Sequence, residues 1–344
     1  MAFYWLVFLT GLVTTLVATP AVRALALKFG IVDRPGERRV HSSPIPLLGG
    51  IAICLGFILS VLLFCDVGSP VVGLLVGGVF ILAVGVVDDV LDLKPWQKLM
   101  CQIAAALVLV LFGGKIEFLT NPFGGMVYLS YLSIPLTVLW IVALTNVVNF
   151  MDGIDGVCAG ISAITCLTVF SVAWLNDQPY VAPLALALAG AALGFLRYNL
   201  HPATIFMGDA GAMFLGYTIA GISVIGAVKG ATTFALSIPA VALGLPIMDT
   251  AFVIAGRIGR GSPFYKPDNS HMHHRLLSRG FDQRQAAAFM FRISILLAVS
   301  ALILSRHDIL TMAVAAVVAS VAVVQAVMTV RSGDATAHRE TRPL

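Results

Sequence analysis

Residues 69–94 read SPVVGLLVGGVFILAVGVVDDVLDLK, an apolar run that ends in two adjacent aspartates, Asp88 and Asp89, and a lysine, Lys94. The part from 69 to 87 is long enough to cross a hydrocarbon core of about 30 Å as a helix. Ten further apolar runs flank it, so the sequence predicts about eleven membrane-spanning helices. They are expected near residues 3–22, 48–65, 69–87, 99–113, 133–150, 157–175, 182–197, 211–228, 232–256, 286–304 and 309–330.

Composition places the whole chain in the bilayer. Of its 344 residues, 59% are hydrophobic and 11% are charged, and the mean hydropathy is +0.97. A water-soluble domain of this composition would expose large apolar patches. We therefore expect an all-α polytopic membrane protein, with a single transmembrane domain over residues 1–330 and a polar cytoplasmic tail over 331–344. The net charge of +4 follows from the loops and does not indicate a nucleic-acid partner.

Basic residues in the loops predict the orientation, because lysine and arginine are retained on the cytoplasmic side. With eleven spans, eighteen of the 21 basic residues fall on one side, and Lys115, Lys229 and Arg306 fall on the other. This distribution predicts an N-terminus outside and a C-terminus in the cytoplasm. The longest outer loop contains Gly124 and Gly125 between apolar residues, and we expect it to form a small periplasmic hairpin.

Polar residues at the inner ends of the apolar runs are unusual, because ionisable groups at membrane depth are costly and mark sites or pathways. Asp88 and Asp89 end the third run, and adjacent carboxylates repel each other unless a cation or protons intervene. Lys94 and Lys98 follow shortly after them. A solvated helix end is the alternative interpretation, and it accounts better for one aspartate than for two.

A second segment, NVVNFMDGIDG at 146–156, spaces Asn146, Asn149, Asp152 and Asp155 three residues apart. On a helix that continues to this point, the first three lie on adjoining faces, and the glycines permit a sharp loop. An asparagine pair can instead bridge two helices by hydrogen bonds. The two Asp-Gly units that follow favour a ligand site.

A third segment, FMGDAG at 206–211, presents Asp209 beside glycine just before the eighth run. Magnesium takes one or two carboxylates together with phosphate oxygens and water, so one open aspartate suffices when a substrate carries a diphosphate. An ordinary turn aspartate is the alternative.

A fourth segment, HMHHR at 271–275, carries three histidines and an arginine in the longest cytoplasmic loop. No nearby cysteine and no His-Glu-x-x-His helix accompany them, which disfavours zinc. Histidine and arginine donate hydrogen bonds to phosphoryl oxygens, so the segment predicts phosphate binding, with a polar surface loop as the alternative. Asp249, inside the ninth run, is left out of the predicted site because a structural ion pair near Arg257 explains it equally well.

Together, the four segments resemble the polyprenyl-phosphate N-acetylhexosamine-1-phosphate transferase family, within glycosyltransferase family 4, in order and spacing over nearly the whole chain. The stretch from Pro267 and Asp268 to Arg275 is similar to the form found in bacterial enzymes that load GlcNAc-1-phosphate onto undecaprenyl phosphate. One position departs from the pattern: the glycine-aspartate motif of the family usually ends in serine, whereas this chain has Ala212. The departure bears on how magnesium or phosphate is held.

The resemblance implies transfer of HexNAc-1-phosphate, foremost GlcNAc-1-phosphate, from a UDP-sugar to undecaprenyl phosphate, with release of UMP. The lipid-linked sugar would start a cell-envelope polysaccharide. It also implies Mg²⁺, or Mn²⁺ in its place, and a catalytic domain facing the cytoplasm in a bacterial inner membrane, with a homodimer left open. The predicted roles are catalytic for Asp88 and Asp89, magnesium binding for Asp209 and Asn149, and substrate binding for Asp152, Asp155, Lys94, Lys98, His271, His273, His274 and Arg275.

Two other classes are weighed against this one. A transporter would move ions through broken helices with intramembrane acids such as Asp249. The motifs do not repeat along the chain and gather on one predicted face, which argues against transport. A degenerate, non-catalytic homologue would tolerate drifting motifs, and Ala212 is the hint in that direction.

Overall fold

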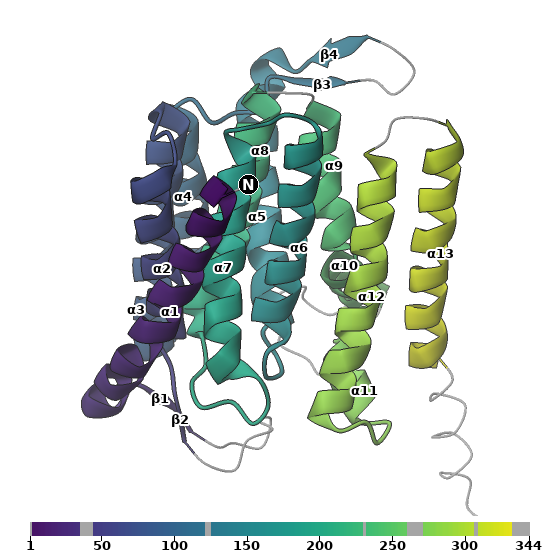
Figure 1. Cartoon of the computed structure of the whole chain (residues 1–344). Coiled ribbons are helices and arrows are strands. Elements are labelled where there is room, and N and C mark those ends of the chain that lie inside the picture. Colours follow the sequence, from purple (N-terminus) through teal and green to yellow (C-terminus); the bar gives the residue numbers. More distant parts are fainter. Residues whose placement is uncertain are drawn as a thin grey trace, which may run out of the picture.

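The computed structural model describes residues 2–34, 44–120, 125–229, 232–259, 271–305 and 309–331. Within these ranges the chain consists almost wholly of helices packed side by side (Figure 1). The helices are α1 (Ala2–Phe29), α2 (Gly49–Phe64), α3 (Ser69–Leu91), α4 (Pro95–Leu111), α5 (Ser133–Met151), α6 (Val157–Leu175), α7 (Val181–Asn199), α8 (Gly208–Lys229), α9 (Thr232–Ala242), α10 (Gly244–Gly259), α11 (Met272–Leu277), α12 (Gln283–Leu304) and α13 (Ile309–Arg331). A 3₁₀ turn, Ser130–Leu132, precedes α5. The predicted tail beyond Arg331, and Pro267 with Asp268, lie outside the described residues.

Seven of the described helices are long and apolar enough to cross a membrane, namely α1, α3, α5 with its 3₁₀ turn, α6, α7, α8 and α12. The bent pair of α9 and α10 makes eight if it counts as one span. Three shorter apolar helices, α2, α4 and the Val314–Val327 part of α13, lie where further runs are predicted. The prediction of a helical, multi-span membrane protein is confirmed, while the count of eleven stays a prediction.

The ninth predicted run is divided into two helices. The segments Ala235–Ala242 and Gly244–Gly259 meet at an angle of 72°. Pro239 and Pro246 each lack the N–H group that a continuous helix requires. The two prolines therefore permit the break at Leu243, which gives α10 a direction different from that of α9.

The most enclosed span is α8, because 94% of its apolar stretch is buried inside the protein. It packs against α2, α3, α5, α7 and α9. A Cβ on Gly85 of α3 would lie 2.3 Å from the Cα of Ala210, and one on Gly216 would lie 2.7 Å from the Cα of Thr145 on α5. Backbones approach this closely only where small residues meet. These contacts hold the C-terminal parts of α3 and α5 against the first turns of α8.

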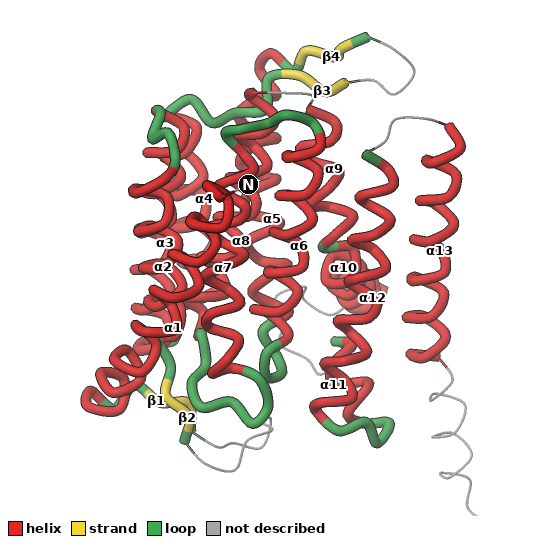
Figure 2. Tube along the Cα trace, viewed as in Figure 1, coloured by secondary structure: helices red, strands yellow, loops and turns green. Residues whose placement is uncertain are grey.

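The two ends of the bundle differ in character (Figures 1 and 2). One end carries the antiparallel pair β3 (Phe118–Thr120) and β4 (Met126–Tyr128), which confirms that the loop around Gly124 and Gly125 forms a small hairpin. The other end carries β1 (Val32–Asp33) paired with β2 (Ile45–Pro46), together with α11. In the described chain, β3 and β4 are the predicted hairpin, and β1 with β2 is an exception to the all-α prediction. The end with β1, β2 and α11 is called the polar end below.

Candidate active site

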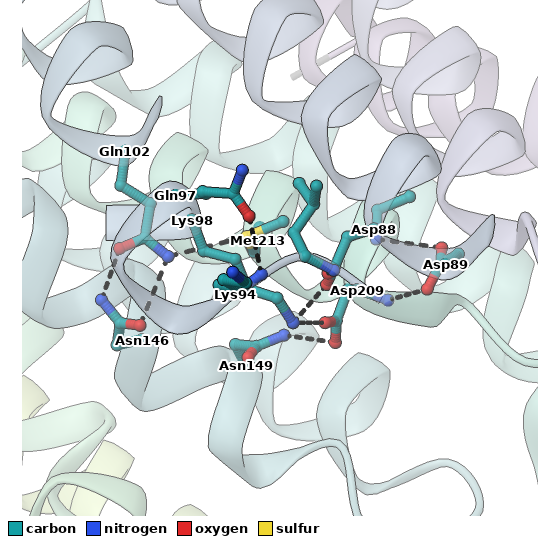
Figure 3. A network of polar contacts seen from close by, with 12 residues as sticks. Asp88, Asp89, Lys94, Gln97, Lys98, Gln102, Asn146, Asn149, Asp209 and Met213 are labelled. Atoms are coloured by element: carbon teal, nitrogen blue, oxygen red, sulfur yellow. Dashed lines mark hydrogen bonds and ion pairs between the residues drawn. The ribbon is translucent and has the colours of Figure 1, made fainter. Parts of the chain in front are cut away.

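Lys98, near the start of α4, joins two of the predicted segments at the polar end. Its ammonium forms an ion pair with Asp88 at the end of α3, and another with Oδ2 of Asp209 at the start of α8, the latter at 2.7 Å (Figure 3). Asn149 of α5 donates from Nδ2 to Oδ1 of Asp209 at 2.8 Å. Only 2% of the Asp88 side chain is exposed, against 34% for Asp209. Asp209 is therefore the more exposed of the two carboxylates that pair with Lys98.

Asp89 anchors the start of α8. Its Oδ1 accepts the backbone N–H of Asp209 at 2.8 Å, and its Oδ2 accepts that of Ala210 at 3.3 Å. A carboxylate is favourable there because the first N–H groups of a helix have no partner within it. Gly208 has a φ of 69°, and a Cβ on it would lie 2.2 Å from Oδ2 of Asp89. The geometry thus makes Asp89 a positioning residue for Asp209, and its catalytic role stays a prediction.

Next to this cluster, the side-chain amides of Gln102 and Asn146 hydrogen-bond to each other and connect α4 to α5. Asn146 donates to Oε1 of Gln102 at 2.6 Å, and Gln102 donates back to Oδ1 of Asn146 at 3.3 Å (Figure 3). Gln102 lies one turn beyond Lys98, and Asn146 lies one turn before Asn149. The pair therefore fixes the two helices next to the residues that meet Asp209. Sequence reasoning singled out Asn146 but missed Gln102, whose signal is an amide inside an apolar run.

The loop from Asp152 to Gly156 turns between α5 and α6. Oδ2 of Asp155 accepts the backbone N–H of Ala203 at 3.0 Å and lies 2.7 Å from Nδ1 of His201. Asp155 therefore ties its own loop to the connection between α7 and α8. Burial, reinforced by the negative charges of neighbouring aspartates, raises the pKa of Asp152 to about 8. Asp152 is thus a carboxyl group whose charge depends on what binds beside it.

The histidine segment, residues 271–275, contacts the helix bundle through Asp249 of α10 and not through the Asp209 cluster in the described contacts. Nδ1 of His271 lies 2.9 Å from Oδ2 of Asp249 on α10, and the backbone N–H of Met272 donates to Oδ1 of the same carboxylate at 2.8 Å. The rings of His271 and His273 are parallel, with centroids 5.9 Å apart. Sequence reasoning left Asp249 out of the site and considered a pair near Arg257, whereas the structure brings Asp249 to His271 and Met272. Nothing in the sequence reveals this partner, because the bend at Leu243 directs α10.

His273 is a buried packing residue in this structure. Its ring lies against Gly153, where an added Cβ would be 2.2 Å from both Cε1 and Nε2. Only 4% of the residue is exposed, and burial, followed by the adjacent His274 and His271, lowers its pKa to about 3. A neutral ring held in this way suits the support of the 152–156 loop better than charge pairing with phosphate. Its predicted substrate contact stays a prediction.

A cavity of about 700 Å³ opens among these elements. It is lined by Val32, Asp33, Arg34, Leu47, Asp88, Asp89, Val90, Asp92, Asp152, Gly153, Ile154, Asp155, Asn199, Phe206, Gly208, Asp209, His274 and Gln283. Residues from eight separate stretches of the chain therefore share one cavity. A volume of this size is typical of small-molecule sites.

The structure separates the predicted residues into two groups. Asp88, Asp89, Asp152, Asp155, Asp209 and His274 line the cavity. Lys94, Lys98, Asn149, His271, His273 and Arg275 lie behind or beside its described lining. Lys94 is exposed at the start of α4, and Arg275 is half-buried on α11. Gln283, at the start of α12, is a lining residue that sequence reasoning missed, since a single polar residue at a helix start carries no pattern.

The oxygen atoms near Asp209 suit a hard cation. Among the described residues, no group of three or more His, Cys, Asp or Glu side chains is placed to hold a metal ion by itself. Magnesium does not need such a cage, because it binds through one or two protein oxygens and completes its shell with water and phosphate oxygens. Asp209, with 34% of its side chain exposed, supplies one such oxygen. The Asn149 amide, whose N–H donates to Asp209 at 2.8 Å in this structure, would supply a second oxygen after its amide turns over.

The fold and the cavity together define a polytopic membrane protein with an aspartate-rich site at one end of its helix bundle. Residues 71–227 match the model of Glycosyl transferase family 4. The chain is 38% identical over 306 residues to a probable undecaprenyl-phosphate N-acetylglucosaminyl 1-phosphate transferase from Bacillus subtilis. The aligned part covers 88% of this chain and 85% of that protein. This protein therefore belongs to Glycosyl transferase family 4.

Two further relatives carry related names. A decaprenyl-phosphate N-acetylglucosaminephosphotransferase from Mycolicibacterium smegmatis is 38% identical over 319 residues, covering 83% of this chain and 78% of that protein. An undecaprenyl-phosphate alpha-N-acetylglucosaminyl 1-phosphate transferase from Escherichia coli K12 is 29% identical over 293 residues, covering 80% of this chain and 77% of that protein. All three names specify a polyprenyl phosphate and N-acetylglucosamine phosphate.

Proposed function

We propose that this protein transfers GlcNAc-1-phosphate from UDP-GlcNAc to undecaprenyl phosphate and releases UMP. The names of the relatives support the lipid phosphate as acceptor and GlcNAc-phosphate as the transferred group. The observation that carries the proposal is the meeting of the four polar segments around one cavity of about 700 Å³ at the end of a membrane bundle. The alternatives of a transporter and a degenerate homologue receive no support from these relatives.

In this reaction an oxygen of the lipid phosphate attacks the phosphorus attached to the sugar. A new P–O–P bridge forms, the bond from that phosphorus to the oxygen of UMP breaks, and the electron pair leaves with UMP. The second pKa of a phosphomonoester is about 6, so the acceptor is largely a dianion at neutral pH and needs no obligatory base. Asp88, in the cavity lining, is the candidate to take the proton from the remaining monoanion.

The main barrier is the approach of one anion to another, which requires positive charge and in-line placement. Lys98 bridges Asp88 and Asp209 beside the cavity and is the proposed contact for the acceptor phosphate. His274, in the lining, and His271 and Arg275, close to it in sequence, are the proposed contacts for the donor diphosphate. Asp152 and Asp155 are proposed to face the nucleoside and sugar.

We further propose magnesium as the cofactor, with manganese as a substitute. Asp209 would hold it, and the Asn149 side chain would turn its oxygen toward it. When bound, the ion neutralises charge on the donor diphosphate. Asp89 then acts by holding the backbone of Asp209 in place through its two accepted hydrogen bonds.

The membrane arrangement proposed here has eleven spans in one catalytic domain over residues 1–330, a bacterial inner membrane, and the polar end in the cytoplasm. It is supported by the excess of basic residues in the loops predicted on that side. A water-soluble nucleotide sugar reaches the cavity from that side, while the prenyl tail stays in lipid. We also propose that the lipid-linked product starts a cell-envelope polysaccharide and that the protein is able to form a homodimer.

The test is UMP release by purified protein in detergent, with undecaprenyl phosphate and a panel of UDP-HexNAc donors, with and without magnesium. The proposal predicts UMP that depends on lipid acceptor and metal, with UDP-GlcNAc as the best donor. Asp209→Asn should abolish it, while Asp177→Asn, on an exposed turn at the hairpin end with a φ of 50°, should not. Folded wild-type protein that makes no UMP with any donor would reject the proposal.

A further inference from the structure

Asp249 is an acidic residue inside an apolar helix, and both of its carboxylate oxygens are engaged by the histidine segment. Oδ2 faces Nδ1 of His271 at 2.9 Å, and Oδ1 accepts the backbone N–H of Met272 at 2.8 Å. Their side chains are enclosed, with 14% of His271 and 16% of Asp249 exposed. An ionisable side chain inside an apolar helix costs free energy unless it pairs with other polar groups, and such a residue usually has a functional role.

The two contacts have different consequences. An ionised carboxylate only accepts hydrogen bonds, so Nδ1 of His271 carries a proton and Nε2 is the ring nitrogen left for a ligand. The Met272 N–H is the first of α11, so the second contact fixes where that helix begins. One side chain thereby sets the tautomer of His271 and the position of the helix that carries His273 and His274.

This anchor is linked to the cavity through packed rings. His271 lies parallel to His273 at 5.9 Å, and His273 lies against Gly153 in the loop that contributes Asp152. His274, next along α11, lines the cavity itself. A displacement of the histidine segment at Asp249 would therefore also move the 152–156 loop and His274 in the cavity lining.

We propose that Asp249 is a positioning residue for phosphoryl transfer, acting through His271, an inference that rests on the proposed function. The carboxylate holds Nδ1–H of His271, so that the imidazolium donates from Nε2 to a phosphoryl oxygen of the donor while Asp249 balances its charge. A charged donor of this kind forms a hydrogen bond roughly twice as strong as a neutral one. Asp249 itself touches no substrate atom in this arrangement.

Asp249→Asn is the informative substitution, because it keeps the size of the side chain and an oxygen for Met272 N–H. Its amide group donates to Nδ1, which moves the ring proton to Nε2 and removes the balancing charge. We expect kcat to fall on the order of 10- to 100-fold, the range seen for outer partners of functional histidines, with KM for UDP-GlcNAc within about threefold of wild type. Asp249→Glu, which restores the charge, should recover part of that loss.

Asp282→Asn is the matched control, since Asp282 also caps a helix start at this end, accepting from the N–H of Gln285 at 2.7 Å, but is exposed and pairs with no histidine in the described contacts. It should keep wild-type kcat. Thermal unfolding in detergent checks that each variant is folded. A loss of kcat equal to that of Asp249→Asn would show that removal of any cap at this end is sufficient, and would overturn the assignment.

A double-variant cycle and NMR of ¹⁵N-labelled histidine complete the test. Asp249→Asn combined with His271→Gln should be no slower than His271→Gln alone within about threefold. In Asp249→Asn the His271 signal should change from protonated at both ring nitrogens to protonated at Nε2 alone. Additive losses, or an unchanged kcat in Asp249→Asn, would overturn the inference while leaving the proposed function intact. An inactive wild type would instead reject the proposed function.

Discussion

The Asp209 cluster and the histidine segment belong to one site but are held in different ways. Asp88, Lys98, Asn149 and Asp209 project from the ends of four helices that pack directly on one another. The histidines lie on α11, a helix of six residues, and depend on contacts with Asp249 and Gly153 for their position. The first region is fixed by the bundle, and the second is fixed by a few side-chain contacts. Substitutions should therefore affect chemistry in the first region and placement in the second.

The largest effect is expected from Asp209→Asn, which removes the exposed charge of the cluster. UMP release should fall about 10³-fold, as when a preorganised electrostatic group is lost. Thermal unfolding is measured in parallel to confirm that the variant is folded, because Asp209 also pairs with Lys98 and accepts from Asn149. Asp89→Asn should cost less, about 10-fold, because it weakens the anchor of Asp209 without touching the ligand. Equal losses in the two variants would mean that Asp89 acts directly, and the distinction between chemistry and positioning would not hold.

The next effect is expected from Gly153→Ala, which tests how the histidine segment is placed. The new methyl group would lie 2.2 Å from the His273 ring, so the ring or the loop must move. We expect kcat/KM to fall on the order of 10- to 100-fold, comparable to a misplacement of about 1 Å near the reaction centre. Steady-state kinetics of Gly153→Ala, His273→Ala and the double variant measure this.

Because His273→Ala removes the obstacle, the double variant should be no slower than His273→Ala alone. Losses that multiply would contradict a steric origin. Gly68→Ala, where nothing lies within 4 Å of the added Cβ and φ is −72°, is the control for adding a methyl group without a collision.

A smaller effect is expected from Gln102→Ala, which removes the Gln102 partner of the half-buried Asn146 amide and leaves Asn146 with its donation to the backbone oxygen of Val142 at 2.8 Å. The free energy of unfolding should fall by about 1–3 kcal/mol, the usual cost of an unsatisfied buried polar group. The paired replacement Gln102→Leu with Asn146→Leu should recover most of this, since both polar groups are then absent. Unfolding by denaturing detergent measures both variants. A double variant less stable than Gln102→Ala would show that the amides do more than satisfy each other.

The last effect is a change in stability with pH, and it has opposite directions for His273 and Asp152. The pKa of His273 is about 3 in the folded protein and about 6.5 in a free side chain, so the unfolded chain binds more protons between these values. The free energy of unfolding should decrease as pH falls from 6.5, by about 2 kcal/mol at pH 5. In His273→Phe this loss should be absent, which unfolding measured at pH 7 and pH 5 will establish.

Asp152 makes the free energy of unfolding change with pH in the opposite direction. Its pKa is raised from 3.8 to about 8, so the folded protein retains a proton that the unfolded chain releases, and stability should fall as pH rises through this window. Asp152→Asn should flatten that part of the profile. A profile unchanged by both substitutions would contradict the burial assigned to these two groups.

Much of the fold was predictable, because a bilayer imposes one length and one composition on every span. Each predicted run falls on a described helix, and the hairpin lies where Gly124 and Gly125 indicated a turn. The bend of 72° at Leu243 was not predicted. Apolar residues continue across it, and the prolines on either side allow a break without requiring one.

The site was predictable at the level of segments and less so at the level of contacts. Asp88 and Asp209 were expected to lie at helix ends on the same side of the membrane, and both pair with the ammonium of Lys98 at the polar end. That this end faces the cytoplasm stays a prediction. The partners Gln102 and Asp249 were missed, because a pairing between distant helices depends on their rotation and direction. A sequence pattern reports the face of one helix, whereas a contact requires the faces of two.

The most direct test of the account follows the phosphorus atom. Purified protein in detergent is given undecaprenyl phosphate, magnesium and UDP-GlcNAc labelled with ³²P in the phosphate next to the sugar, and the lipid and water-soluble products are separated. The account predicts that the label enters the lipid product together with the sugar, that unlabelled UMP is released, and that Asp209→Asn stops both. Label that remains in soluble UDP while sugar alone reaches the lipid would contradict phosphosugar transfer at this site.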